Sequence, residues 1–231
     1  DGRWFGKYPP GYPAVLSLGV RLGAHWLVNP LLAALTVALI YALARALYRN
    51  DRRRSPETRQ RHHTSPLTTG DHPPVSISWP ILLLTISPFF LIMSGSLMAH
   101  PAEMFWTALF MLAWTRVVDS GRARWAIVSG VALGMLFLTR QFTALTVGVS
   151  FGVGWAALNG WRNRGIAGHL SAAWLRRLAI SVLILLAVLA PFALVLPAYQ
   201  AAVTGDPFAD PRLLYWPYDR VGFGPGTGEA Q

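Results

Sequence analysis

The chain has 231 residues, of which 53% are hydrophobic and only 13% are charged, and its formal net charge is +10. Its mean hydropathy is +0.39, whereas a soluble domain carries about a quarter charged residues, so the composition excludes an ordinary soluble domain and favours a membrane protein. Cysteine is absent, which excludes a disulfide framework and a thiolate metal site.

The first segment, "GRWFGKYPPGYP", holds Lys7, the only lysine of the chain. The two prolines keep the preceding residue extended, so the lysine stands on a stiff segment beside Trp4, Tyr8 and Tyr12. An ammonium group in such a place suits a phosphate. The alternative is an aromatic belt with an anchoring lysine at the membrane surface, and composition leaves both interpretations open.

Residues 13–26 form an apolar stretch that is too short to cross a bilayer. Ser17, Arg21 and His25 recur every fourth residue, which predicts one polar stripe on a helix lying in the outer interface. A tilted crossing with Arg21 reaching toward the headgroups is the alternative. Asn29-Pro30 then predicts the start of the first crossing, with a cap residue and a proline at the first helical position.

Apolar patterning predicts about six membrane crossings in all, at about 29–48, 77–98, 102–118, 125–139, 141–158 and 178–199. We expect Pro80 and Pro88 to be tolerated inside one helix. The glycines at 130, 134, 148, 152 and 154 should permit close helix packing.

The excess positive charge falls on one side of this topology. Three connecting segments hold 14 arginines and four acids, whereas the other side holds six basic and six acidic residues. The positive-inside rule makes the arginine-rich side cytoplasmic, so the charge reflects topology and excludes nucleic acid as a partner. The cytoplasmic loop 49–74 contains histidines without acids or cysteines at ligand spacing, and we expect no metal site or cofactor.

Unusual polar residues gather on the outer side. His100 and Glu103 begin a predicted helix after a tight turn, and Glu103 either favours the helix dipole or acts in a site. Arg140 marks a predicted helix break and is either an anion contact or a boundary residue. In the outer loop 200–231, Asp219 either pairs with its neighbour Arg220 or touches a substrate.

Four segments together resemble a known family: "GRWFGKYPPGYPAVLSLG", "NPLLAALTVALIYALARALY", "SPFFLIMSGSLMAHPAEMF" and "GVALGMLFLTRQFTAL". They are similar to bacterial C-type (GT-C) integral-membrane glycosyltransferases, within them to the protein mannosyltransferase and lipid A aminoarabinose transferase relatives (glycosyltransferase family 39). The likeness covers most of residues 3–158. It implies a polyprenyl-phosphate-linked sugar donor, a lipid, glycan or protein acceptor, and inverting transfer on the extracytoplasmic face of the bacterial inner membrane.

The resemblance also implies roles for individual residues. In this family a lysine just before paired prolines contacts the donor phosphate, and an aromatic residue three positions earlier assists, which points to Lys7 and Trp4. The family aromatic is usually tyrosine, and a tryptophan lacks its hydroxyl. Arg140 is a further donor-phosphate candidate, and the remaining candidates for substrate contact are Tyr8, Tyr12, Arg21, His100 and Asp219.

The catalytic carboxylate of the family lies upstream of the lysine motif, so we expect this chain to be an inactive fragment of a longer enzyme. The expected architecture is an all-α polytopic transmembrane bundle. Residues 1–28 would carry the outer motif and interfacial helix, 29–199 the transmembrane domain, and 200–231 an outer loop. The alternative is a transporter, flippase or binding subunit for a polyprenyl-linked glycan, which an acidic pair upstream of residue 1 would argue against.

Overall fold

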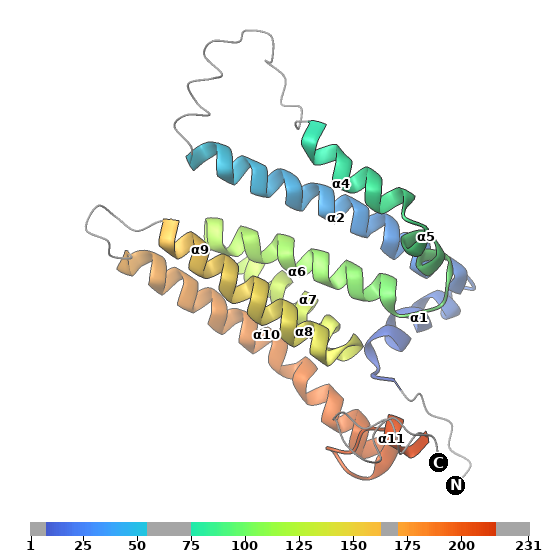
Figure 1. Cartoon of the computed structure of the whole chain (residues 1–231). Helices are drawn as coiled ribbons and strands as arrows, with labels where there is room; N and C mark the ends of the chain where they lie inside the picture. The colour runs from blue at the N-terminus through green and yellow to red at the C-terminus, as the bar shows by residue number, and fades with distance from the viewer. Residues whose placement is uncertain (1–7, 55–74, 163–170, 216–231) are drawn as a thin grey trace, which may run out of the picture.

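The computed structural model describes residues 8–54, 75–162 and 171–215, and within these ranges the chain forms helices and no strand. Figure 1 shows them as a bundle of long helices with short elements gathered at one end. In chain order they are α1 (Gly11–Arg21), α2 (His25–Arg54), α4 (Val75–Ile86), α5 (Pro88–Gly95), α6 (His100–Ser120), α7 (Ala123–Thr139), α8 (Gln141–Val147), the π-helical segment η1 (Gly148–Val153), α9 (Gly154–Arg162), α10 (Ala172–Thr204) and α11 (Arg212–Tyr215).

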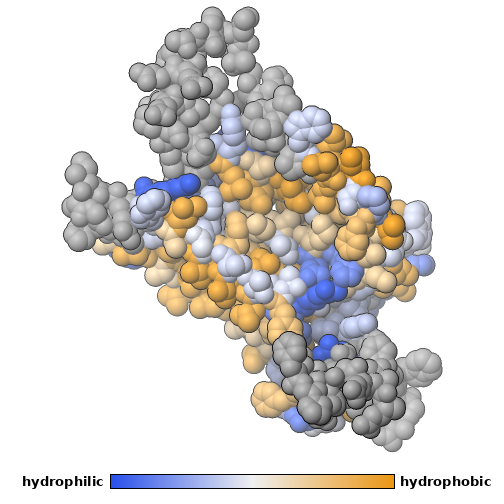
Figure 2. Space-filling model, viewed as in Figure 1, coloured by the Kyte–Doolittle hydropathy of each residue, from blue (hydrophilic) through white to orange (hydrophobic). Residues whose placement is uncertain are grey.

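Three helical stretches among the described residues are long and apolar enough to cross a membrane: His25–Arg49, Gln141–Arg162 and Ala172–Thr204. Helix α7 is a shorter apolar helix. Hydrophobic side chains cover much of the face drawn in Figure 2. The all-α prediction is therefore confirmed for the described residues, and the three stretches indicate a multi-pass membrane protein. The predicted crossings at 102–118 and 125–139 stay predictions, and the one at 77–98 is formed by two separate helices.

Helices α6 and α7 form the centre of the bundle, because α2 packs on α6 and α10 packs on α7. The largest buried cluster includes Phe110 and Trp114. The prediction that glycines permit close helix packing is confirmed at two positions. A Cβ added at Gly130 would lie 2.8 Å from the Val188 side chain, and one added at Gly134 would lie 2.5 Å from the Phe192 ring. It is wrong for Gly154, where an added Cβ would meet nothing within 4 Å.

The two ends of the bundle differ in charge. One end of the bundle contains the last turns of α2 and α9, the α6–α7 turn and the first turn of α10. We call it the arginine-rich end, because it holds the described arginines 45, 49, 116, 122, 124, 162, 176 and 177. Helices α1, α5 and α11 lie at the opposite end (Figure 1). The ion pairs of Glu103 with Arg140 and of Asp210 with Arg212 belong to that opposite end.

One prediction for the interfacial helix 13–26 and one for the start of the first crossing are wrong. Helix α1 ends at Arg21 and the chain turns at Gly23, whose φ of +67° suits glycine, so His25 begins α2 and does not continue a stripe on α1. Asn29 is not a helix cap, since α2 begins four residues earlier and Pro30 lies inside it. Its buried amide instead donates hydrogen bonds to the carbonyls of Ser96 and Met98, between α5 and α6.

The predicted helix 77–98 is broken in two, contrary to the expectation that Pro88 would be tolerated inside it. Ser87 is extended (φ −62°, ψ 121°) and caps α5, and Pro88 is the first residue of α5. A proline has no N–H to donate a hydrogen bond to the preceding turn, and it disfavours helical backbone in the residue before it. The chain therefore starts a new helix at this proline.

Candidate functional site

The predicted break near Thr139-Arg140 is confirmed, and it determines where the Arg140 side chain lies. Helix α7 ends at Thr139, Arg140 is extended (φ −152°, ψ 105°), and α8 begins at Gln141. The Arg140 N–H still donates to the Leu136 carbonyl at 2.7 Å. This single extended residue sends the arginine side chain sideways toward the first turn of α6.

Four side chains from α6 and the α7–α8 junction meet there, and we call His100, Glu103, Arg140 and Thr143 the Arg140 cluster. Arg140 Nε lies 3.2 Å from Glu103 Oε2, and the Thr143 hydroxyl donates to Glu103 Oε1 at 2.6 Å. His100 Nδ1 lies 3.6 Å from Glu103 Oε2 and 3.4 Å from Arg140 Nη2. One carboxylate therefore faces two nitrogen-bearing side chains.

The exposed part of the cluster is its basic part. The Arg140 side chain is 45% exposed and that of His100 is 32% exposed, whereas Glu103 is only 16% exposed. Figure 2 shows a hydrophilic region among hydrophobic side chains, in the part of the view where α6 and α8 begin in Figure 1. A half-exposed guanidinium on a less exposed carboxylate is suited to bind a phosphate from the open side.

Glu103 stands in the first turn of α6, as expected. Its contacts with Arg140 and Thr143 were not predictable, because these partners lie about 40 positions further along the chain. The sequence showed both Glu103 and Arg140 as unusual outer residues, and only the packing of α6 on α7 pairs them.

Helix α1 lies at the same end of the bundle. A Cβ on Gly11 would lie 2.6 Å from the Leu138 carbonyl carbon, so α1 begins in close contact with the last turn of α7. Tyr12 follows and packs against Leu32 and Ala102. Burial raises the pKa of the Tyr12 hydroxyl, and Asn29 partly offsets the shift. Neither this hydroxyl nor Asn29 Oδ1 makes a hydrogen bond of normal geometry within the described residues.

The other candidates are not brought to the cluster by any described contact. Tyr8 is exposed just before α1, and Arg21 is the last residue of that helix, about 15 Å along its axis from Gly11. Lys7, Trp4 and Asp219 lie outside the described residues. No group of three described histidine or acidic side chains could hold a metal ion.

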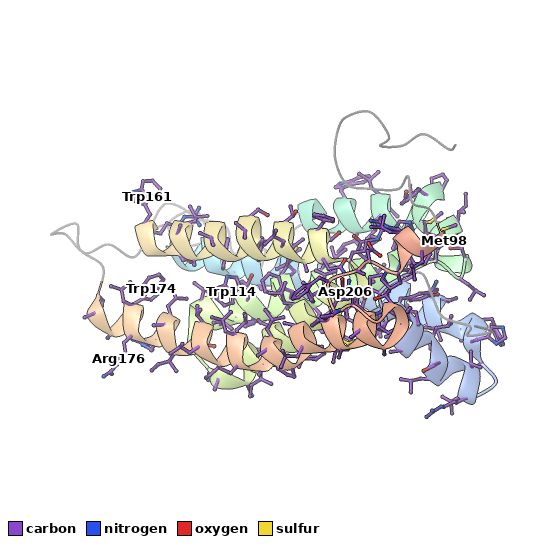
Figure 3. The ribbon with its side chains drawn as sticks, turned by 90° about the horizontal axis from the view of Figure 1, so that it is seen from below. Met98, Trp114, Trp161, Trp174, Arg176 and Asp206 are labelled. Atoms are coloured by element: carbon purple, nitrogen blue, oxygen red, sulfur yellow. The ribbon has the colours of Figure 1, made fainter. Side chains whose placement is uncertain are left out.

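An apolar groove that sequence reasoning missed lies along the bundle, and its lining includes Gln141, the residue after Arg140. It has a volume of about 950 Å³ and lies between the stretch α8–η1–α9 and helix α10. Its lining starts at Gln141, directly after Arg140, and reaches Trp161. Figure 3 looks at it from below, with Trp114 and Trp174 between the yellow and the orange helix. The Trp114 indole donates to the Gly152 carbonyl at 2.8 Å.

Small residues make room for this groove. Its lining includes five of them, four positions apart: Ala144, Gly148, Gly152, Ala156 and Gly160. The sequence carries this signal, but the same spacing is typical of close helix contacts in membranes. Here the stripe leaves space instead, because α10 packs mainly on α7.

No protein-family model, no curated protein and no solved structure matches this chain.

Proposed function

We propose that the chain is part of a membrane glycosyltransferase that transfers a sugar from a polyprenyl-phosphate donor to an acceptor at the extracytoplasmic face. The observation that carries the proposal is that the Arg140 cluster is followed directly in the chain, at Gln141, by the lining of an apolar groove. The basic cluster is suited to the anionic head of an amphiphile, and the groove is suited to its long apolar tail. The family resemblance of the four sequence segments supports the same ligand.

The length of the groove supports a polyprenyl tail over an ordinary acyl chain. From Gln141 to Trp161 the lining covers 20 residue steps, which is about 30 Å of helix. The hydrocarbon core of a bilayer is also about 30 Å thick, and one acyl chain covers only the half that belongs to its leaflet. A tail that fills the groove is therefore longer than one leaflet.

The chemistry proposed for the cluster is stabilisation of the leaving group. Transfer of the sugar breaks its bond to the phosphate, and negative charge develops on the phosphate oxygen. The Arg140 guanidinium would stabilise that charge, with Lys7 and Trp4 supplying further contacts. Lys7 stands four residues before Gly11, the residue at which α1 meets the end of α7. A carboxylate upstream of residue 1 would accept the acceptor proton.

Charge distribution supports the proposed orientation. Arginines concentrate at the end of the bundle remote from the Arg140 cluster. By the positive-inside rule the arginine-rich end faces the cytoplasm, so the cluster would face the opposite side, where polyprenyl-linked sugars are used.

The test is donor-lipid binding by the intact protein that contains this chain, in nanodiscs of zwitterionic lipid. Polyprenyl phosphate should bind, and Arg140→Ala should weaken binding about tenfold. A charge-assisted hydrogen bond contributes about 1.5–3 kcal/mol, and the 45% exposure of this side chain favours the lower part of that range. Lys7→Ala should weaken binding at unchanged expression.

Arg212→Ala is the matched control, because it removes an arginine at the same end whose ion pair is with Asp210 and not with Glu103. Equal binding by Arg140→Ala and the unchanged protein would refute the phosphate role. Movement of the donor across the bilayer without release of its sugar would favour the transporter alternative.

A further inference from the structure

Glu103 is the least exposed member of the three ionisable groups in the Arg140 cluster, and it touches the other three side chains. We propose that Glu103 is a positioning residue, which fixes the Arg140 guanidinium in the orientation that receives the donor phosphate. The inference rests on the function proposed for Arg140, and it assigns to Glu103 a role beyond its interaction with the helix dipole of α6.

The geometry leaves the useful part of the guanidinium available. An arginine carries one N–H at Nε and two at each terminal nitrogen. Glu103 Oε2 lies 3.2 Å from Nε, and the His100 ring lies 3.4 Å from Nη2. The carboxylate therefore occupies the Nε side, His100 stands beside Nη2, and the N–H groups of Nη1 are left for a phosphate. The carboxylate is itself held, because the Thr143 hydroxyl donates to its other oxygen at 2.6 Å.

Arg140 needs such a partner because its surroundings do little to fix it. The residue lies between two helices with extended backbone, and 45% of its side chain is exposed. A long side chain in that situation samples many rotamers, and binding a phosphate would remove that freedom. Glu103 restricts the side chain before the ligand arrives, so less entropy is lost on binding.

Positioning and simple electrostatics predict opposite signs for the removal of Glu103. A carboxylate beside a phosphate site repels the phosphate, so electrostatics alone predicts tighter binding when the acid is lost. Positioning predicts weaker binding, because Arg140 is no longer held. The sign of the change therefore separates the two explanations.

The experiment is a double-mutant cycle in the intact protein, in nanodiscs of zwitterionic lipid, with sugar-free polyprenyl phosphate as the probe. Glu103→Ala should weaken binding about fivefold, the size expected for a partly exposed ion pair. The double variant with Arg140→Ala should bind no more weakly than Arg140→Ala alone, because Glu103 acts through Arg140. Asp206→Asn is the matched control, since it removes a negative charge at the same end outside the cluster.

The outcomes are distinguishable. If Arg140→Ala weakens binding but Glu103→Ala leaves it unchanged or tightens it, the positioning role is refuted and the proposed function stands. If Arg140→Ala itself has no effect, the phosphate role of Arg140 fails, and the inference fails with it. Should Glu103→Ala not fold, Thr143→Val tests the same point, because it releases the carboxylate without removing its charge. It should weaken binding about twofold, and unchanged binding would overturn the proposal.

Discussion

Replacing Gly148 by leucine should obstruct the apolar groove without disturbing the helices around it. Gly148 lines the groove, and a Cβ added there would lie 3.5 Å from the Leu133 side chain, which is an ordinary van der Waals distance. The backbone therefore does not need to move, and the rest of the leucine side chain extends into the groove. We expect weaker binding of a polyprenyl phosphate.

The size of the effect follows from packing rather than from the hydrophobic effect, because the tail moves between two apolar surroundings. The added side chain displaces several tail carbons, and each lost contact between carbon atoms forfeits about 0.1–0.2 kcal/mol. Membrane lipids replace part of these contacts. A net loss of about 1 kcal/mol remains, which is about a fivefold increase in Kd.

The assay is quenching of tryptophan fluorescence by a polyprenyl phosphate with a spin label on its tail, because Trp114 and Trp174 line the groove. Gly154→Leu is the matched control: it adds the same side chain six positions away, where an added Cβ meets nothing within 4 Å. Wild-type quenching by Gly148→Leu would refute the reasoning, and so would an equal loss in both variants with unchanged Tm.

Three further predictions concern stability in detergent. Gly134→Leu should destabilise the bundle by about 1–3 kcal/mol, because its Cβ would lie 2.5 Å from the Phe192 ring. Its Tm should fall well below that of Gly154→Leu, and equal Tm values would contradict the packing of α7 on α10. Asn29→Leu removes the buried amide that donates to the Ser96 and Met98 carbonyls. Each hydrogen bond contributes about 0.5–1.5 kcal/mol, so the loss should be about 1–3 kcal/mol. An unchanged Tm would show that these hydrogen bonds are dispensable. Burial raises the pKa of Tyr12 above its ordinary 10.0, so above pH 10 the unfolded chain releases a proton that the folded protein keeps, and stability should fall as pH rises. Tyr12→Phe should lose less stability between pH 9 and pH 11 than the unchanged protein, and parallel Tm curves would contradict this.

Local sequence patterns predicted the helices well where an apolar stretch is long. The stretches around 29–48, 141–158 and 178–199 reappear inside the three helical segments capable of spanning a membrane. The break at Arg140 was also predictable. Patterns failed where one residue type serves two purposes, since Asn29 reads as a cap but binds carbonyls about 70 positions away.

The sequence by itself determined the membrane character, the helical class and the concentration of arginines at one end, because each depends on the composition of a continuous stretch. The tertiary structure decided the site. It paired Glu103 with Arg140 and Thr143 across about 40 positions. It also made a stripe of small residues part of a groove, because α10 packs mainly on α7 and not on that stripe. Such contacts depend on which helices become neighbours, and the spacing of residues within one helix does not contain that information.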